Sequence, residues 1–145
     1  MAEMGNIRLK KSKKLPLPDE RTLKMLVEFI NFAAKKLELG DEQPIVITLL
    51  HANPNQPITT GAFDPSDKSI RCIIQNRNFI DYIRTIAHEL THLQQAVTGQ
   101  LNGEIREIGG DIEDNANASS GRIVKSYIKN VLTKEQKSFL GLGSF

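Results

Sequence analysis

The stretch between Asn78 and Thr98 constrains the fold of this chain more than any other. Asn78, followed by Asp81, predicts the start of a helix, and Gly99 predicts its end. Apolar residues recur every three or four positions and so share one side of that helix, namely Phe79, Ile83, Ile86, Leu90, Leu93 and Val97. Such a face is stable only when other elements cover it, so the rest of the chain has to build a core around it.

Two further helices and a small sheet are predicted around this segment. Apolar residues with helical spacing fill 19–37, ahead of Gly40, and a last long helix is expected over 111–132. The run Ile45–Leu50 is short and β-branched at its start, which favours a buried strand. We therefore expect a fold of the α+β class.

Residues 61–63 and 69–75 flank a turn-rich connector and are expected to form a β-hairpin. The second segment alternates between a more apolar and a more polar face, which suits a strand near the edge of a sheet. The first face carries Ile70, Cys72 and Ile74, and the second carries Arg71, Ile73 and Gln75. We expect Cys72 to be a small core residue.

Length and composition narrow the class of protein. A chain of 145 residues fits one domain, and 19 Lys and Arg against 17 Asp and Glu are too balanced for an obligate nucleic-acid or membrane binder. The one cysteine excludes an internal disulfide and a Cys-based zinc site, so a metal has to be held by His and carboxylate groups. No apolar run approaches the roughly 18 to 20 residues of a membrane span, and no signal peptide is recognisable. We expect a cytoplasmic protein.

The chain is expected to divide into a flexible N-terminal part, a folded domain and a C-terminal tail. Residues 1–18 are rich in Lys and punctuated by Pro, which predicts a flexible basic arm. Residues 19–132 form the folded domain, and 133–145 form a C-terminal tail. The arm either solubilises the chain or contacts nucleic acid through residues 8–14. The apolar end of the tail, 139–145, either packs, stays disordered or occupies a cleft.

The pattern His88-Glu89-Leu90-Thr91-His92 carries the chemistry of the 78–98 helix. Histidines four residues apart lie one above the other, so both rings can reach one metal ion. Glu89 is offset by about 100° and lies beside the open coordination position, where a general base belongs. The pattern arises by chance in roughly 0.4% of such chains. Both histidines face away from the apolar stripe, which disfavours two ordinary core histidines.

A third metal ligand is expected from a carboxylate, since His51 is the remaining histidine. Glu113 lies in the middle of the apolar arc of the 111–132 helix, where an ionised group needs a partner. Asn117, one turn later, can hydrogen-bond a ligand. Two alternatives stay open. Glu113 can simply complement the helix dipole, or the ligand can be Glu104 or Glu107 in the preceding connector.

These residues resemble the gluzincin zinc metallopeptidases, in which an HExxH helix is followed by a third ligand in an ExxA(N/D) setting. Here Glu113 is followed by Ala116 and Asn117. The segment 87–95, AHELTHLQQ, is similar to small single-domain HExxH proteins of bacteria and phages, and the ExxAN spacing is similar to the ImmA/IrrE group. The resemblance implies a minimal zincin-like fold, with an N-terminal helix, a small mixed sheet with an edge strand, an active-site helix and a third-ligand helix.

The same resemblance implies a function and its residues. One Zn²⁺ per chain would be held by His88, His92 and Glu113, with Glu89 as the general base for hydrolysis of a peptide or protein substrate. Residues 69–75 would bind the substrate as an added strand, so that Arg71 and Ile73 would contact it.

One part of the family pattern is missing, because no motif identifies the residue that stabilises the oxyanion. Tyr127, Tyr82, His51 and Arg122 are expected to be structural. The alternative function is therefore a weak or inactive member of the fold that regulates or binds, using the basic arm on nucleic acid or an acidic partner. A purely structural zinc would need four protein ligands.

Overall fold

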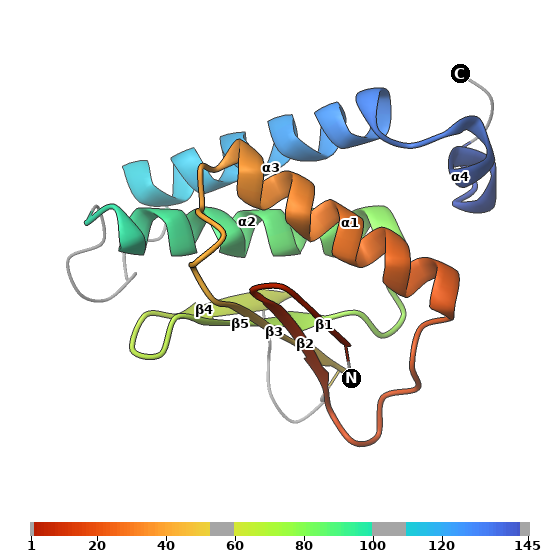
Figure 1. The fold of residues 1–145 in the computed structure, drawn as a ribbon, viewed down its shortest axis with the longest axis horizontal. Coiled ribbons are helices and arrows are strands. Elements are labelled where there is room, and N and C mark those ends of the chain that lie inside the picture. Colours follow the sequence, from red (N-terminus) through yellow and green to blue (C-terminus); the bar gives the residue numbers. More distant parts are fainter. Residues whose placement is uncertain (1, 53–59, 100–109, 143–145) are drawn as a thin grey trace.

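The described helices lie on one face of a mixed β-sheet, as Figure 1 shows. The structure is a computed structural model that describes residues 2–52, 60–99 and 110–142. Within these ranges helices and strands form two layers, which confirms the expected α+β class. Most of the loop expected at 51–60 and of the connector expected at 99–110 lies outside the described residues.

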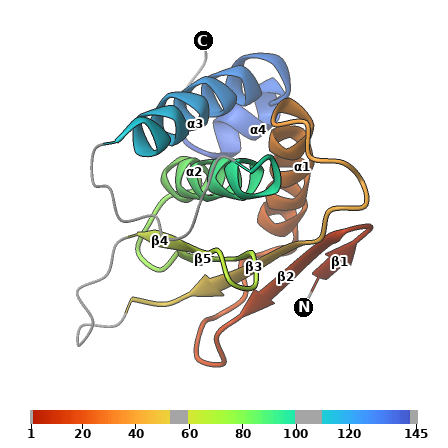
Figure 2. The same cartoon turned by 90° about the vertical axis from the view of Figure 1, so that its left-hand side faces the viewer.

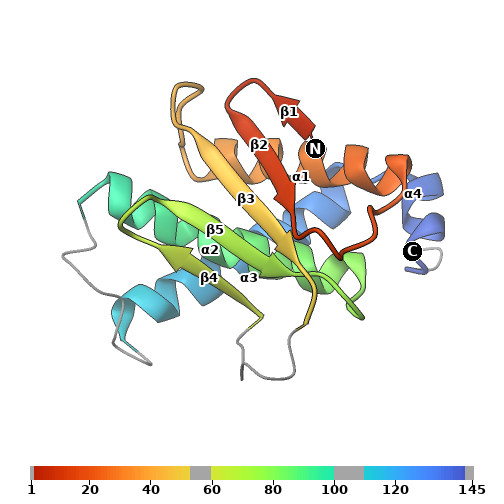
Figure 3. The same cartoon turned by 90° about the horizontal axis from the view of Figure 1, so that it is seen from below.

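The sheet has the strand order β1-β2-β3-β5-β4, which can be followed in Figure 3. The three central strands β2, β3 and β5 run parallel, and β1 and β4 are added antiparallel at the two ends. In chain order the strands are β1 (Ala2–Met4), β2 (Ile7–Lys11), β3 (Ile45–Leu50), β4 (Gly61–Asp64) and β5 (Ser69–Ile73).

The prediction of a flexible arm over residues 1–18 is wrong. Residues 2–11 form β1 and β2, and β2 pairs with β3 along its whole length. Ile7 and Leu9 are 2% and 0% exposed because they alternate with polar residues and point towards the helices. The Lys-rich composition concealed this alternation, which has only two apolar members and depends on a partner strand far along the chain.

The predicted hairpin is confirmed, but the expected edge strand is not. β5 is hydrogen-bonded to β3 on one side and to β4 on the other, so β4 lies at the end of the sheet. Arg71 is exposed and Ile73 is buried in this internal strand. The polar alternation of β5 arises because no described helix covers the second face of the sheet, and not because the strand lies at an edge.

The predicted helices are confirmed with small differences in their bounds. Their N-termini follow the sequence signals: the Asp19 side chain accepts from the Thr22 amide at 2.7 Å, and Asn78 accepts from Asp81 at 2.9 Å. The helices are α1 (Glu20–Lys36), α2 (Phe79–Val97), α3 (Asp111–Asn130) and α4 (Lys134–Phe139). None of the helices in the described part of the chain is long and apolar enough to cross a membrane.

Helix α2 lies between the sheet and α3, with α1 beside it, as Figure 2 shows. Its apolar stripe is buried against β4, β5 and α1, while α3 packs along a second side. Cys72 is fully buried against this helix, with its sulfur 3.7 Å from the Tyr82 carbonyl oxygen, as expected for a core residue. This arrangement leaves the histidine side of α2 facing α3 and β4.

The segment expected as a C-terminal tail contains α4, which begins with a capping box between Thr133 and Gln136. Phe139 lies under the guanidinium of Arg21 at 4.2 Å, beside the start of α1. The part of the tail that the structure describes therefore packs on α1 and does not enter the cleft beside α2. Residues 143–145 are outside the described ranges.

The strand assignment of β2 predicts unequal effects for two neighbouring substitutions. Leu9→Ala removes a fully buried side chain and should lower the free energy of unfolding by about 2 to 5 kcal/mol. Lys10→Ala changes an exposed side chain and should shift it by less than about 0.5 kcal/mol. Urea denaturation of both variants measures the difference, and equal small effects would contradict the buried strand.

Candidate metal centre

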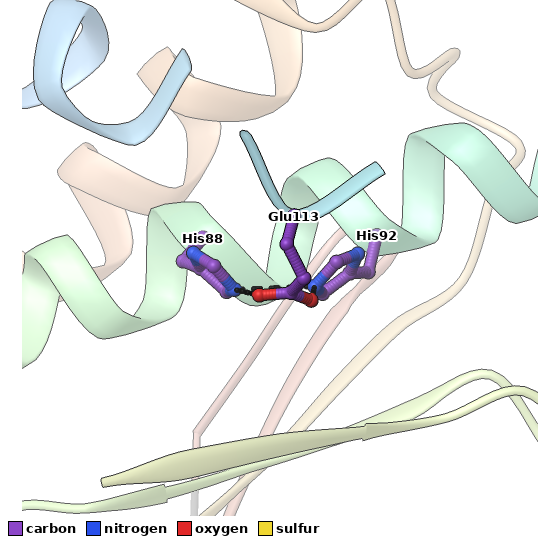
Figure 4. Close-up of side chains that lie close together, drawn as sticks. All are labelled: His88, His92 and Glu113. Atoms are coloured by element: carbon purple, nitrogen blue, oxygen red, sulfur yellow. Dashed lines mark hydrogen bonds and ion pairs between the residues drawn. The ribbon is translucent and has the colours of Figure 1, made fainter. Parts of the chain in front are cut away.

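Three potential metal ligands converge where α2 and α3 pack together, as Figure 4 shows. His88 and His92 come from the middle of α2, and Glu113 comes from the first turn of α3. The two Nε2 atoms are 3.1 Å apart, and they lie 3.3 and 2.7 Å from the two carboxylate oxygens of Glu113. The sequence-predicted set of His88, His92 and Glu113 thus forms one cluster that can hold a metal ion.

Gln95 joins the two helices at this cluster. Its side-chain nitrogen donates to the Ile112 carbonyl at 3.0 Å and to Asn115 Oδ1 at 2.9 Å, both at the start of α3. Its side-chain oxygen lies 2.8 Å from His92 Nδ1. Sequence reasoning missed Gln95, although its position three residues after His92 on the same helix was a usable signal.

The contacts of Gln95 determine the protonation of His92. Since a backbone carbonyl can only accept, the amide nitrogen of Gln95 faces Ile112 and the amide oxygen faces His92. His92 Nδ1 therefore carries a proton, and in the neutral ring Nε2 presents a lone pair. That lone pair faces a carboxylate oxygen of Glu113 at 2.7 Å. Two groups this close require positive charge between them, which a bound cation or a proton on Nε2 supplies.

The spacing of the three groups fits a tetrahedral ion. Ligand bonds of roughly 2.0 to 2.1 Å place neighbouring donor atoms about 3.3 Å apart. The two Nε2 atoms, 3.1 Å apart, are close to this spacing. The Glu113 oxygen that lies 2.7 Å from His92 Nε2 would have to move away by about half an ångström to act as the third donor. Among the described residues, two imidazoles and one carboxylate contribute, and such a three-ligand set is found in catalytic zinc sites, whereas structural sites use four protein ligands.

Burial favours the metal-binding form of His88. The His92 and His88 side chains are 3% and 18% exposed. Burial lowers the pKa of His88 from its ordinary 6.5, and the nearby His92 lowers it further, while Glu113 and Asn117 oppose the change. The Asn117 side chain hydrogen-bonds to His88, so it lies where the sequence analysis expected a residue that supports a ligand.

Glu89 lies on the wall of the same cavity, next to the cluster but not in it. It is 7% exposed, and burial together with the charge of Glu113 raises the pKa of its carboxyl from 4.5 to about 8. A β-carbon on Gly61 of β4 would meet Thr85 Cγ2 at 2.5 Å and Glu89 Cγ at 3.6 Å. Only a glycine therefore lets β4 come this close to Thr85 of α2, one turn before Glu89.

The cavity has a volume of about 700 Å³ and is bounded by β4, α2 and α3. Arg71 and Ile73 are not among its lining residues, so the expected substrate contacts of β5 are not found there. The possible oxyanion-stabilising residues also lie elsewhere: Tyr127 donates to Glu28 and to the Met25 carbonyl. Tyr82, His51 and Arg122 do not line the cavity either, and Glu104 and Glu107 lie outside the described residues.

Comparisons of the chain with models of protein families, with curated proteins and with solved structures found no match. The site itself defines a class of centre, in which two imidazoles and one carboxylate from two helices can hold a metal ion. A buried carboxyl group and an open cavity lie beside it. Any function has to be inferred from these features, because a fold alone does not determine one.

Gln95 should affect metal affinity although it is not a ligand. Gln95→Leu removes the acceptor that orients His92 and should weaken Zn²⁺ binding by about 10-fold to 100-fold. Gln94→Ala is the matched control, because the Gln94 side chain donates to the Leu37 carbonyl after α1 and, within the described residues, not to the metal cluster. Competition with a chromogenic chelator measures both affinities. Equal affinities would show that the Gln95 contact does not orient the ligand.

The raised pKa of Glu89 predicts how the stability of the metal-free protein depends on pH. The folded state keeps a proton on Glu89 up to about pH 8, whereas the unfolded chain releases it near 4.5. This group therefore lowers stability progressively as pH rises from about 4.5 to 8. Glu89→Gln should flatten that decline in urea unfolding midpoints, and Glu42→Gln, which removes an exposed carboxylate, should not. A decline that persists in Glu89→Gln would contradict the assignment.

Proposed function

We propose that this protein is a zinc-dependent metallopeptidase, with His88, His92 and Glu113 as zinc ligands and Glu89 as general base. The observation that carries the proposal is the pairing of an open three-ligand cluster with a buried carboxyl group that lines the same cavity. Hydrolytic zinc sites need both parts, since the ion alone cannot move the proton.

The protein groups have separate tasks in this mechanism. A bound Zn²⁺ would supply Lewis acidity and positive charge at this cluster. Glu89, ionised beside that charge, would accept a proton from the attacking water. Glu89 returns this proton to the nitrogen of the leaving amine, so the carboxylate is regenerated. Gln95 and Asn117 hold the two imidazoles in place through their hydrogen bonds.

The strand that would receive a peptide is β4 instead of β5. Among the described strands, β4 pairs only with β5, so its other edge faces the cavity region. An extended substrate can add to such an edge through backbone hydrogen bonds. The close approach of Gly61 to α2 would bring the bound backbone next to Glu89 and the metal.

The alternative is a fold of the same kind that binds and regulates without turnover. A nucleic-acid partner was expected to contact the basic residues 8–14. Of these, Arg8 and Lys10 are exposed on β2. These side chains project from the face of the sheet opposite to the helices, away from the cavity. A binding role would therefore use a different surface from the candidate metal centre.

Metal content and cleavage measured together test the proposal. Purified wild type should contain about one zinc per chain by elemental analysis and cleave members of a broad peptide library. Glu89→Gln should keep the zinc and lose cleavage by about 100-fold or more. Glu113→Ala should lose the zinc, because only two ligands remain. Glu42→Gln, which changes an exposed carboxylate, serves as the control and should retain both properties.

Two results would contradict the proposal in different ways. Zinc binding without cleavage of any peptide would favour the binding and regulatory function. Failure of the wild type to bind zinc or another divalent ion would mean that the His-His-Glu cluster is a hydrogen-bonded structural feature.

A further inference from the structure

Arg84 lies on the wall of the cavity, one helical turn before His88. Residues 84, 88 and 92 are spaced by four, so they follow one another along the same side of α2. Arg84 is exposed, and no hydrogen bond or ion pair to any residue in the described part of the chain engages its guanidinium. Among the described residues, none therefore competes with a ligand for this cation.

The second arginine of the cavity has a structural role. Arg77 donates to the Ile73 carbonyl at 2.8 Å, to the Asp81 carbonyl at 3.0 Å and to Thr85 Oγ1 at 2.7 Å. These contacts fasten the end of β5 to the first turns of α2. The donors of Arg77 are thus used within the protein, in contrast to those of Arg84.

No acid in the described part of the chain forms an ion pair with Arg84. α3 runs antiparallel to α2, since Gln95 contacts Asn115 while His88 contacts Asn117. Further along α3 the cavity is lined by Ser120, which is neutral and donates to the Asn117 carbonyl. Asp81 also lines the cavity at the N-terminal end of α2. It lies farther along the helix from His88 than Arg84 does, and it forms no ion pair with Arg84.

We propose that Arg84 binds a carboxylate of the substrate and so selects acidic peptides, an inference that rests on the peptidase function proposed above. Arginine suits this task because its planar fork forms two parallel hydrogen bonds with a carboxylate. The acid can be an Asp or Glu side chain or the free C-terminus of a short peptide. Both sources present the same group to Arg84.

The length of α2 determines where that acid lies in the substrate. The midpoint between His88 and His92 is six residues from Arg84, or roughly 9 Å along the helix axis. An extended peptide advances roughly 3.3 to 3.6 Å per residue. The recognised carboxylate therefore lies two or three residues from the bond that is cleaved.

A binding experiment tests this selectivity without turnover. Zinc-loaded Glu89→Gln protein is titrated with fluorescein-labelled heptapeptides in which one position at a time is Asp, Asn or Lys, each with a free or amidated C-terminus. At one position of the peptide, Asp should bind roughly tenfold more tightly than Asn, or else the free C-terminus should bind roughly tenfold more tightly than the amidated one. Comparison of the two kinds of C-terminus identifies the source of the carboxylate.

Arg84 variants in the same background show whether this residue is responsible. Adding Arg84→Gln should reduce the acid preference from roughly tenfold to about one, and Arg84→Lys should keep part of it. Arg84→Glu should reverse the preference, so that Lys binds better than Asp at the same position. Lys24→Gln removes an exposed charge of α1, outside the cavity lining, and should leave the preference unchanged. A reversal cannot result from misfolding, which would weaken binding of all peptides.

The outcomes separate the two proposals. Cleavage by the wild type that depends on Glu89 but shows no acid preference would overturn the role of Arg84 and leave the peptidase function intact. An acid preference that persists unchanged in Arg84→Gln would also overturn it, as would the absence of binding to every peptide. An acid preference that follows Arg84 in the binding experiment, without cleavage by the wild type, would support carboxylate recognition and contradict the peptidase function.

Discussion

The structure around α2 depends on one electrostatic constraint, the contact of the Glu113 carboxylate with two imidazoles. These groups stay together when positive charge, from a metal ion or a proton, lies between them. The contact of Glu113 with both histidines requires the first turn of α3 to lie against the middle of α2, and Gln95 reinforces this position from the side of His92. The packing of the two helices and the chemistry of the site are thus parts of one arrangement.

Much of this arrangement could be predicted from the sequence because its signals are local. The spacing of apolar residues in α2 predicts a helix, and the spacing of His88 and His92 puts them on a side that faces away from the apolar stripe. Glu113 was recognisable because an acid in an apolar helical arc needs a partner. Each of these inferences uses only the geometry of one helix.

The errors arose where the deciding contact is far along the chain. β2 offers only Ile7 and Leu9 as apolar signals among basic residues, and its pairing with β3 brings together residues that are nearly 40 positions apart. The polar side of β5 looked like an edge strand because periodicity cannot distinguish an uncovered face from an uncovered edge. Gln95 was missed because an amide on a helix has no compositional signature. Its importance follows from its contacts with His92 and with α3.

The two faces of the sheet differ in how freely their residues can be substituted. One face carries the core and supports α2, so a substitution there disturbs packing and the metal cluster together. The other face has no described helix over it and presents side chains such as Lys10, Thr48 and Arg71 in one cross-strand row. Mutations can accumulate in this row during evolution without altering the cleft. A chain of this size can therefore acquire a second partner on one side while selection preserves the chemistry on the other.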